Sequence, residues 1–250
     1  MATPFHLNHK TVLVTGASSG IGKQVAIECS KMGARVVITG RNTERLHDTF
    51  KKMEGEGHSQ ISCDLTDNGD LNKFTEKLPL LDGIVHSAGM VLPVPAKFTE
   101  EKHIAQLLGL NFNIPALLTG KLLKNKKLND NSSIVFLSSV AVNYPYTGSA
   151  IYSASKGAIE AYSKNLALEL HTRKIRSNCL VLSMVNTPIF QETIKQGMHG
   201  SNVDEYASKY LLGIGEPQDV AYAVVYLLSE ASRWVTGTNM VVDGGYSILK

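Results

Sequence analysis

Apolar residues along the chain gather into short runs, and segments with helical spacing lie between them. Seven runs have the length of a strand: 11–15, 35–39, 60–64, 82–89, 132–139, 175–182 and 239–243. They lack the strict polar–apolar alternation of half-exposed strands, so the pattern indicates strands that are buried on both faces. Strands of this kind are typical of parallel sheets.

The segments between the runs predict helices. The first has five apolar residues on one helical face: Ile21, Val25, Ala26, Cys29 and Met32. Further helices are expected over roughly 42–54, 100–126 and 150–172, and another begins with Pro217 in its first turn. Alternating strands and helices predict an α/β fold of the Rossmann type, in which a doubly wound, seven-stranded parallel sheet carries helices on both faces.

The pattern runs without interruption by a linker, a repeat or a low-complexity tract. Residues 1–250 are therefore expected to form a single Rossmann-fold domain. One irregular stretch, at about 183–213, is too long for an idle connection. Because insertions near the carboxyl ends of strands often cover a ligand, we interpret this stretch as a substrate loop.

Composition narrows the class of protein without assigning a function. Of the 250 residues, 43% are hydrophobic and 19% are charged, and the net charge is +3, as in an ordinary globular chain. The densest basic cluster lacks interleaved aromatic residues and consists of Lys121, Lys124, Lys126 and Lys127. A solvated helix end is the favoured interpretation of this cluster, and no nucleic-acid partner is expected.

Other residue types bear on location and metal content. The longest clean apolar run, "AYAVVYLL" at 221–228, is too short to cross a bilayer, so no membrane association is expected. The three cysteines lie far apart, which fits a reducing compartment and predicts a cytoplasmic protein. The eight histidines show no H-x-x-x-H spacing, and we expect no metal site.

A glycine-rich turn follows the first predicted strand. The stretch "TGASSGIG" at 15–22 places Gly16, Gly20 and Gly22 where the strand would pass into a helix. Without side chains, the backbone can turn sharply and a pyrophosphate can approach it, while the helix N-terminus offers unpaired N–H groups and the positive end of its dipole. This position favours a dinucleotide site over a purely structural turn.

The second predicted strand ends in "VVITGRN", where an acidic residue would bind the ribose 2′-hydroxyl of NAD. Gly40 provides no carboxylate to repel a phosphate, and the guanidinium of Arg41 matches phosphate oxygens in a two-pronged fit. Asn42 adds a donor, unless it caps the next helix instead. The pattern therefore predicts NADP(H) in preference to NAD(H).

A tyrosine and a lysine lie four residues apart in "YSASK" at 152–156. On a helix, Tyr152 and Lys156 would share one face, although this spacing alone is common and a surface pair is the alternative. A free phenol has a pKa of about 10, and a neighbouring ammonium would lower it, which suits acid–base chemistry on an oxygen. Ser138 and Ser139 end the preceding strand, at the sheet edge where α/β sites form.

Further motifs complete an ordered series from about residue 10 to 247. The series comprises "TGASSGIG", "DL" at 64–65, "AG" at 88–89, Asn111, Ser139, "YSASK", Thr187 and "VTGTNMVVDGG" at 235–245. In this order the motifs resemble the short-chain dehydrogenase/reductase family, above all the NADP-linked branch that includes 3-oxoacyl-[acyl-carrier-protein] reductases. The resemblance implies an oxidoreductase that reduces a carbonyl to an alcohol by hydride transfer.

The resemblance also assigns four catalytic residues. Tyr152 would donate a proton to the carbonyl oxygen, Lys156 would lower the pKa of the tyrosine and bind the nicotinamide ribose, and Ser139 would polarise the carbonyl. Ser139 lies thirteen residues before the tyrosine, a spacing that favours it over Ser138. Asn111 matches a helix asparagine that holds a water of the proton relay, with a buried core amide as the alternative.

The same match assigns the nucleotide contacts. Asp64 would accept a hydrogen bond from the adenine amino group, unless it caps a helix, and Leu65 would pack beside the ring. Ala88 and Gly89 would line the adenosine ribose, and Thr187 would reach the carboxamide or phosphate region. The full set of expected contacts is Gly16, Ser18, Ser19, Gly20, Ile21, Gly22, Arg41, Asn42, Asp64, Leu65, Ala88, Gly89, Tyr152, Lys156, Val185 and Thr187.

Two stretches depart from the family pattern. The first, "HSAG" at 86–89, stands where Asn-Asn-Ala-Gly is common, and we interpret His86 as a core residue without a catalytic role. In the second, Leu182 and Ser183 stand where Pro-Gly often precedes "VNTP". This change removes a rigid backbone turn beside the nicotinamide, so the substrate specificity of the family does not transfer directly.

The predicted substrate pocket has apolar walls from "MVLP" at 90–93, "NYPY" at 143–146 and the substrate loop, with ordinary core packing as the alternative for each residue. The loop residues expected to contribute are Met184, Ile189, Phe190, Ile194, Met198, Tyr206 and Tyr210. The candidate substrates are a 3-oxoacyl thioester, with an acyl-carrier protein as partner, a sugar, a steroid and a small ketone.

Two other functions are weighed against this one. A dinucleotide-binding sensor without chemistry would not need to retain all four catalytic residues. A sugar-nucleotide epimerase or dehydratase would carry T-G-x-x-G-x-x-G and an added substrate domain, which this sequence does not show. The resemblance also implies a homotetramer or homodimer, in which helices near 100–126 and 150–172 pair and the end "YSILK" packs between subunits.

Overall fold

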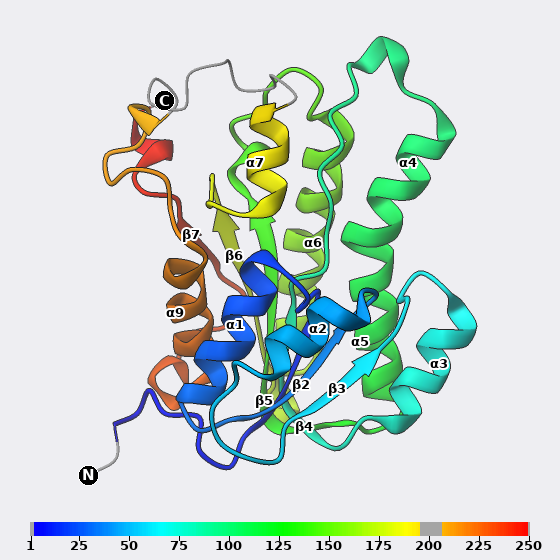
Figure 1. Cartoon of the computed structure of the whole chain (residues 1–250), viewed down its shortest axis with the longest axis vertical. Coiled ribbons are helices and arrows are strands. Elements are labelled where there is room, and N and C mark those ends of the chain that lie inside the picture. The colour runs from blue at the N-terminus through cyan, green and yellow to red at the C-terminus, as the bar shows by residue number, and fades with distance from the viewer. Residues whose placement is uncertain (1–2, 196–206, 250) are drawn as a thin grey trace.

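The seven apolar runs form the seven strands of one parallel sheet, whose order is β3-β2-β1-β4-β5-β6-β7 (Figure 1). The computed structural model describes residues 3–195 and 207–249, without the side chains of residues 193–195. The strands are β1 (Thr11–Thr15), β2 (Arg35–Gly40), β3 (Ser59–Ser62), β4 (Leu81–His86), β5 (Leu128–Ser139), β6 (Arg176–Leu182) and β7 (Asn239–Val242). The predicted doubly wound sheet is confirmed. Strands β1 to β3 extend toward one edge of the sheet and β4 to β7 toward the other, so the strand order reverses between β1 and β4, which are parallel neighbours.

Helices cover both faces of the sheet. One face carries α1 (Gly20–Lys31), α2 (Thr43–Phe50) and α9 (Pro217–Leu228), with α1 and α9 side by side (Figure 1). The other face carries α3 (Asn68–Lys77), α5 (Ile114–Lys124) and α6 (Ala150–Glu169), and α4 (Glu101–Leu108) packs beside α6. A further helix, α7 (Pro188–Lys195), follows the carboxyl end of β6.

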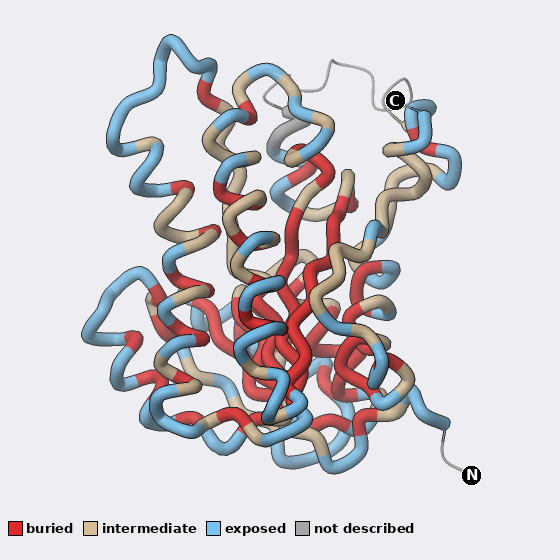
Figure 2. The backbone as a smooth tube through the Cα atoms, turned by 180° about the vertical axis from the view of Figure 1, so that it is seen from behind, coloured by how far each residue is buried: buried red, intermediate tan, exposed pale blue. Residues whose placement is uncertain are grey.

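Alternate residues of the five inner strands supply two separate cores, because successive side chains of a strand point to opposite faces. Val12 and Val14 of β1 pack with α1 and α9, whereas Leu13 between them packs with α3, α5 and α6. All three side chains are fully buried. Figure 2 shows the buried sheet running through the middle of the molecule. Burial on both faces is confirmed for the inner strands, whereas the edge strands β3 and β7 are partly exposed.

The predicted helix at 100–126 is interrupted in the structure. A π-helical turn, Gly109–Asn113, separates α4 from α5. Pro115 in the first turn of α5 has no N–H to donate to the carbonyl of Asn111, and this missing bond falls in the turn. The interruption determines where the side chain of Asn111 points.

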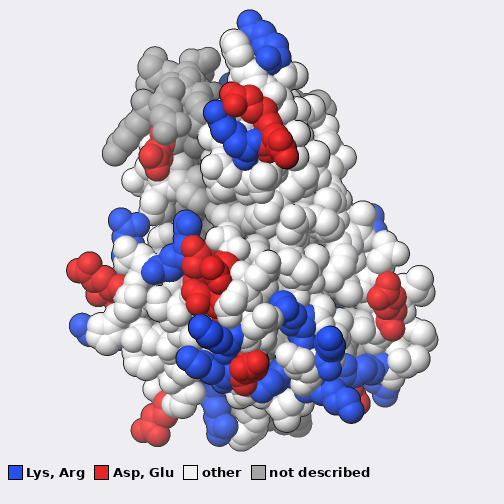
Figure 3. Space-filling view, turned by 90° about the vertical axis from the view of Figure 1, so that its right-hand side faces the viewer, with Lys and Arg blue, Asp and Glu red and all other residues white. Residues whose placement is uncertain are grey.

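The basic cluster near residue 124 lies at the C-terminal end of α5. Lys127 Nζ donates to the carbonyl oxygens of Glu76 (3.3 Å) and Leu78 (2.6 Å) at the end of α3, and Lys121 Nζ donates to Asn72 Oδ1 (2.6 Å). Figure 3 shows basic side chains grouped low on this side of the molecule, with acidic ones among them. The lysines thus lie at the end of α5, where the sequence predicted a helix end, and Lys127 binds carbonyl oxygens at the C-terminus of α3.

Within residues 3–195 and 207–249, each helix is either too short or too polar to cross a bilayer.

Candidate active site

A cavity of about 370 Å³ lies at the carboxyl ends of the strands. Most residues expected in the site line this cavity: Gly16, Ser18, Ser19, Gly20, Ile21, Gly22, Arg41, Asp64, Leu65, Ala88, Gly89, Ser139, Tyr152, Lys156, Val185 and Thr187. Asn42 and Asn111 were expected there as well, but they are not among its lining residues. The fold thus brings motifs from most of the chain to one edge of the sheet.

The turn after β1 has room for glycine alone at two positions. Gly16 has a φ of +66°, and a Cβ there would lie 2.8 Å from the backbone of Ala88. A Cβ on Gly22 would lie 2.5 Å from the carbonyl oxygen of Gly16. The turn therefore packs directly on the backbone that follows β4, and α1 begins close enough to β1 for its N-terminus to face the cavity.

The N-terminus of α1 is well suited to an anion. Ser19 occupies the N-cap position but makes no capping hydrogen bond with its side chain, and the first turn of the helix contains no acidic residue. Gly20 and Ile21 of that turn line the cavity. The first N–H groups and the positive end of the helix dipole are therefore directed at whatever occupies this end of the cavity.

The ends of β2 and β3 bring a cation next to a carboxylate. Gly40 is buried, and a Cβ there would lie 3.2 Å from the side chain of Ser18, so the structure leaves little space for an acidic side chain at this position. Arg41 is exposed at the rim of the cavity. Hydrogen bonds from Thr66, together with the charge of Arg41, lower the pKa of Asp64, which keeps that carboxyl ionised.

Two cap assignments are settled by the hydrogen bonds. Asn42 is the N-cap of α2, because its Oδ1 accepts from the backbone N–H of Arg45 at 2.8 Å. The helix cap that the sequence offered for Asp64 belongs to Asp67, which accepts from the N–H of Asp70 at 2.9 Å. Asp64 instead accepts from the amide and hydroxyl of Thr66 (3.0 and 2.7 Å) in a local turn.

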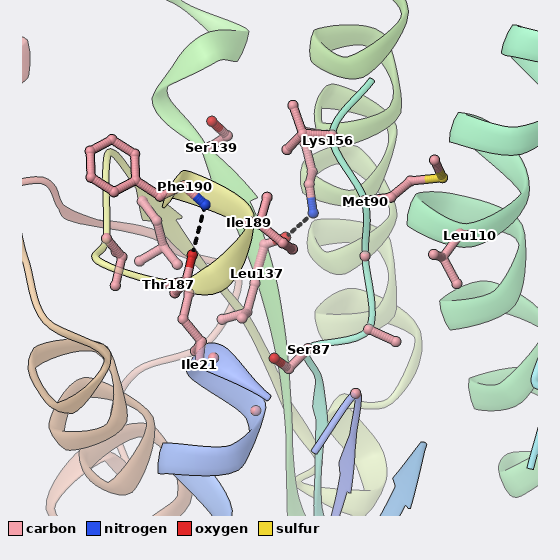
Figure 4. Close-up of a pocket in the computed structure, with 18 of the residues that line it drawn as sticks. Ile21, Ser87, Met90, Leu110, Leu137, Ser139, Lys156, Thr187, Ile189 and Phe190 are labelled. Carbon is pink, nitrogen blue, oxygen red and sulfur yellow. Dashed lines mark hydrogen bonds between the residues drawn. The ribbon is translucent and has the colours of Figure 1, made fainter. Parts of the chain in front are cut away.

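Tyr152 and Lys156 share one face of α6, as their spacing predicts, and both reach the cavity. The Lys156 ammonium donates to the carbonyl oxygen of Leu137 at 2.9 Å (Figure 4). Its Nζ lies 5.8 Å from the centre of the Tyr152 ring. Ser139, at the end of β5, is hydrogen-bonded to Tyr152. A hydroxyl, a phenol and an ammonium therefore meet in one place at the end of β5.

The expectation of a lowered tyrosine pKa is wrong for this structure. Burial raises the pKa of Tyr152 to about 12 and outweighs the hydrogen bond from Ser139, which lowers it. Burial also lowers the pKa of Lys156 to about 8. Both shifts follow from the cost of a charge in a poorly solvated site. Tyr152 therefore holds its proton at neutral pH, the state required of a proton donor.

The two adjacent serines have different partners. The hydroxyl of Ser138 donates to Glu160 Oε1 at 2.6 Å, on the turn of α6 that follows Lys156. Ser139 is the serine hydrogen-bonded to Tyr152, and its Oγ also accepts from the N–H of Ala141 at 3.2 Å. The geometry thus favours Ser139, the serine indicated by the motif spacing.

Asn111 is buried in the π-helical turn and bonded to protein groups. Its Oδ1 accepts from the N–H of Met90 at 2.9 Å, and its Nδ2 donates to the Met90 carbonyl (3.0 Å) and to Ser155 Oγ (3.1 Å). These bonds match the buried-amide alternative that the sequence left open. They join the segment after β4 to the helix that carries Tyr152 and Lys156.

The substrate end of the cavity is mostly apolar. Figure 4 shows Met90, Leu110, Ile189 and Phe190 beside Ser139 and Lys156. The lining residues from the three predicted segments are Met90, Val91, Tyr144, Tyr146, Ser183, Met184, Val185, Thr187, Pro188, Ile189 and Phe190. Two loop residues named from the sequence, Met198 and Tyr206, lie outside the described residues, as does the side chain of Ile194.

Sequence reasoning missed several lining residues, among them Leu110 and Tyr246. Leu110 reaches the cavity from the π-helical turn, which the sequence did not predict. Tyr246 lines the cavity from the segment after β7. A usable signal existed for Tyr246, because it follows the carboxyl end of the last strand, the edge at which the other site residues lie.

His86 is a core residue, as expected. It is 4% exposed, its ring stacks on Phe136 with centroids 4.7 Å apart, and its Nε2 lies 2.9 Å from Thr119 Oγ1. Burial lowers the pKa of His86 to about 3, so the ring is neutral at physiological pH.

Across the described ranges, His, Cys, Asp and Glu side chains form no group of three or more that could hold a metal ion.

Comparison with known proteins places this geometry among oxidoreductases. A family model described as enoyl-(acyl carrier protein) reductase matches residues 16–247. A tropinone reductase homolog of Datura stramonium is 31% identical over 97% of this chain and 93% of its own length. A 3-oxoacyl-[acyl-carrier-protein] reductase of Rickettsia conorii is 28% identical over 96% of this chain and 97% of its own length.

A solved structure from Beutenbergia cavernae shows the same fold. It is described as a candidate NAD(P)-dependent gluconate 5-dehydrogenase with NADP bound at low occupancy. It superposes with a TM-score of 0.86 at 26% identity, and the match covers 98% of this chain and all of that one.

Proposed function

The chain belongs to the short-chain dehydrogenase/reductase family of oxidoreductases, and from this premise we propose that it is an NADPH-dependent reductase that converts a carbonyl to an alcohol. The proposal rests on one observation: Ser139, Tyr152 and Lys156 line the same cavity as the glycine turn after β1. A sensor without chemistry would not require this arrangement.

The described residues fit a dinucleotide. The close approach of Gly16 to Ala88 and of Gly22 to Gly16 leaves a smooth backbone cradle, and the N-terminus of α1 faces it. These are the features that accept a pyrophosphate. Asp64 stands where an adenine amino group would donate to a carboxylate, and Leu65 supplies an apolar surface beside it.

The preference for NADPH rests on the residues at the end of β2. The side chain of Ser18 occupies the space into which an acidic residue at position 40 would project, and Arg41 is exposed beside it. A guanidinium in this position pairs with a 2′-phosphate, and no carboxylate at position 40 opposes that charge. Asn42 contributes as the cap of α2 and so fixes the backbone beside Arg41.

When bound, the reduced nicotinamide supplies the hydride. The chain supplies the proton and the alignment. Ser139 donates a hydrogen bond to the carbonyl oxygen of the substrate, and Tyr152 transfers its proton to that oxygen as negative charge develops there. Lys156 stabilises the phenolate that remains, and its position is set by the Leu137 carbonyl. Asn111 positions the segment that carries Met90 and lies outside the reacting groups.

The substrate class follows from the relatives and from the cavity together. The Rickettsia relative and the family model name acyl-carrier substrates, which makes a 3-oxoacyl thioester one candidate and an acyl-carrier protein a partner. The Datura relative names a ketone reductase. We favour a small ketone, because the described side chains at the substrate end are mostly apolar. A sugar would require more hydrogen-bonding groups there.

We also propose a homotetramer or homodimer in a reducing, cytoplasmic setting. Apolar side chains are exposed on several helices and loops, including Leu117 on α5 (47%), Leu168 on α6 (72%) and Trp234 (91%). Leu117 and Leu168 lie on α5 and α6, within the helical regions that the resemblance expects to pair between subunits. All three cysteines are free and buried, as a reducing compartment allows.

The proposal is tested by NADPH oxidation with purified protein and a panel of 3-oxoacyl thioesters, sugars, steroids and simple ketones. Tyr152→Phe should lower the rate by roughly 100- to 10,000-fold, because the proton donor is lost. Tyr222→Phe is the matched control, since Tyr222 is 56% exposed on α9 and lies outside the cavity. Equal rates for wild type and Tyr152→Phe would contradict the proposal.

A further inference from the structure

Three tyrosines and a serine form a connected chain at the substrate end of the cavity. The hydroxyls of Ser183 and Tyr210 are 2.9 Å apart and hydrogen-bonded. The ring of Tyr210 stacks on Tyr246, with centroids 5.1 Å apart and planes 29° apart. Tyr246 in turn meets Tyr144 edge to face, with centroids 6.3 Å apart at 87°. We refer to Tyr144, Tyr210 and Tyr246 as the aromatic wall.

The aromatic wall is assembled from separate strand ends. Tyr144 follows β5, Ser183 follows β6 and Tyr246 follows β7, and all three line the cavity. Tyr210 is 6% exposed and is not among the lining residues, so it supports Tyr246 from behind. Strands β5, β6 and β7 lie at the opposite side of the sheet from β2 and β3, which carry the nucleotide-side residues. The wall therefore faces the substrate.

Tight backbone packing holds the wall in place. Gly244 and Gly245 both have positive φ (+61° and +82°). A Cβ on Gly244 would lie 2.9 Å from the carbonyl oxygen of Gly213, and one on Gly245 would lie 2.8 Å from Leu211. The N–H of Leu212 donates to the Gly244 carbonyl at 3.1 Å. The segments that carry Tyr210 and Tyr246 are thus fixed to each other before any substrate arrives.

The described residues that line the cavity place no charged side chain beside the aromatic wall. Among its described lining residues, three are charged: Arg41, Asp64 and Lys156. The first two lie at the nucleotide end and interact with each other, and Lys156 is held by the Leu137 carbonyl beside Tyr152. A substrate carboxylate or phosphate at the wall would therefore be desolvated without a counter-charge there, which is costly.

We propose that the aromatic wall binds a planar ring of the substrate, so that the pocket takes uncharged ketones in which such a ring is joined to the carbonyl carbon. The inference rests on the proposed function and narrows its substrate class. Aromatic faces and edges prefer offset-stacked or edge-to-face partners, and the wall presents both geometries in a fixed arrangement. Ser183 is the positioning residue, because its hydroxyl orients Tyr210 behind Tyr246.

A matched pair of probes tests the inference. Acetophenone and cyclohexyl methyl ketone have the same carbon skeleton and carbonyl, but the ring is planar in the first alone. Their Kd values would be measured by ligand-observed NMR titration on the full-length protein with NADP⁺, and their kcat/KM values with NADPH. Acetophenone should bind about 2- to 10-fold more tightly, the range of one favourable aromatic contact.

Two variants separate the wall from general damage to the pocket. Tyr246→Leu should bring the acetophenone preference close to unity, because the planar surface is lost. Ser183→Ala, a smaller change, should weaken the binding of acetophenone more than that of cyclohexyl methyl ketone, because Tyr210 loses its hydrogen-bond partner. Tyr222→Leu, on the exposed face of α9, should keep the wild-type preference. NADPH fluorescence on binding shows that each variant is folded.

The outcomes distinguish this inference from the proposed function. If NADPH binds and carbonyls are reduced, but cyclohexyl methyl ketone binds as tightly as acetophenone, the inference is overturned and the reductase assignment stands. A preference that survives Tyr246→Leu also overturns it. If the wild-type protein does not bind NADPH, both are overturned. The inference stands if the preference is present in wild type and Tyr222→Leu and is lost in Tyr246→Leu.

Discussion

The side chain of Asn111 binds both backbone polar groups of Met90, accepting from its N–H at 2.9 Å and donating to its carbonyl at 3.0 Å. A third bond, to Ser155 Oγ at 3.1 Å, ties the same amide to α6. The buried side chain of Asn111 therefore links the segment after β4, which contains Met90, to α6, the helix that carries Tyr152. We propose that Asn111, which lies in the π-helical turn, positions these elements.

Replacement of Asn111 should damage stability and catalysis together. Asn111→Ala removes the partner of the part-buried N–H and carbonyl of Met90, so the free energy of unfolding should fall by about 1–3 kcal/mol in urea titrations. The kcat/KM for carbonyl reduction should also fall. Asn113→Ala is the control, because Asn113 lies exposed in the same turn. Equal losses in the two variants would argue against the positioning role.

Arg41 should discriminate between the two nicotinamide cofactors. Arg41→Ala removes a charged partner of the 2′-phosphate, worth about 1.5–3 kcal/mol, so the KM for NADPH should rise roughly 10- to 100-fold. The KM for NADH, which lacks that phosphate, should change little. Arg45→Ala serves as a control on the same exposed stretch, outside the cavity. A similar loss with both cofactors would remove Arg41 from the nucleotide site.

Glycine replacements should have opposite effects at two positions. Gly16→Ala forces a Cβ to 2.8 Å from the Ala88 backbone at a φ of +66°, so stability should fall by about 1–3 kcal/mol and NADPH binding should weaken. Gly120→Ala, on α5, meets no atom within 4 Å and should add up to about 1 kcal/mol. Unfolding curves and NADPH fluorescence measure both effects. Unchanged nucleotide affinity in Gly16→Ala would contradict the proposed cradle.

His86 should make the fold sensitive to acid. Its pKa is about 3 in the folded protein against 6.5 for the free side chain, so between these values the unfolded chain binds more protons. Stability is therefore complete above pH 6.5 and is lost as the pH falls toward 3, by about 3 kcal/mol between pH 7 and pH 4. His86→Gln removes the titrating group and should flatten the slope of unfolding free energy over this interval. A slope equal to that of wild type would show that other groups dominate.

The parts of the fold that the sequence predicts correctly are those with strong local signals. The strands follow from uninterrupted apolar runs, and the turn from Gly16 and Gly22 at a strand end. Helix α3 was overlooked, although Leu71, Phe74 and Leu78 have helical spacing and Asp67 caps its start. Short polar helices of this kind have a narrow buried face, which makes their periodicity easy to miss.

The parts that the sequence does not predict depend on tertiary surroundings. The direction of the Tyr152 pKa shift is set by burial, which opposes the effect of a neighbouring ammonium and cannot be read from spacing. Whether Asn42 binds a ligand or caps a helix is decided by the position of the Arg45 amide. Tyr246 enters the site because β7 is parallel to β6 and ends at the same edge.

The sheet order has a consequence for how the chain acquires its site during synthesis. Helix α1 packs against α9, and the aromatic wall includes Tyr246. Segments from the beginning and from the end of the chain therefore both contribute to the folded protein around its site. Before residues 217–246 have been synthesised, the nascent chain contains the complete glycine turn but lacks α9, which packs against α1 in the folded protein. Such long-range closure slows folding. We expect the nascent chain to gain stable structure late, when α9 emerges.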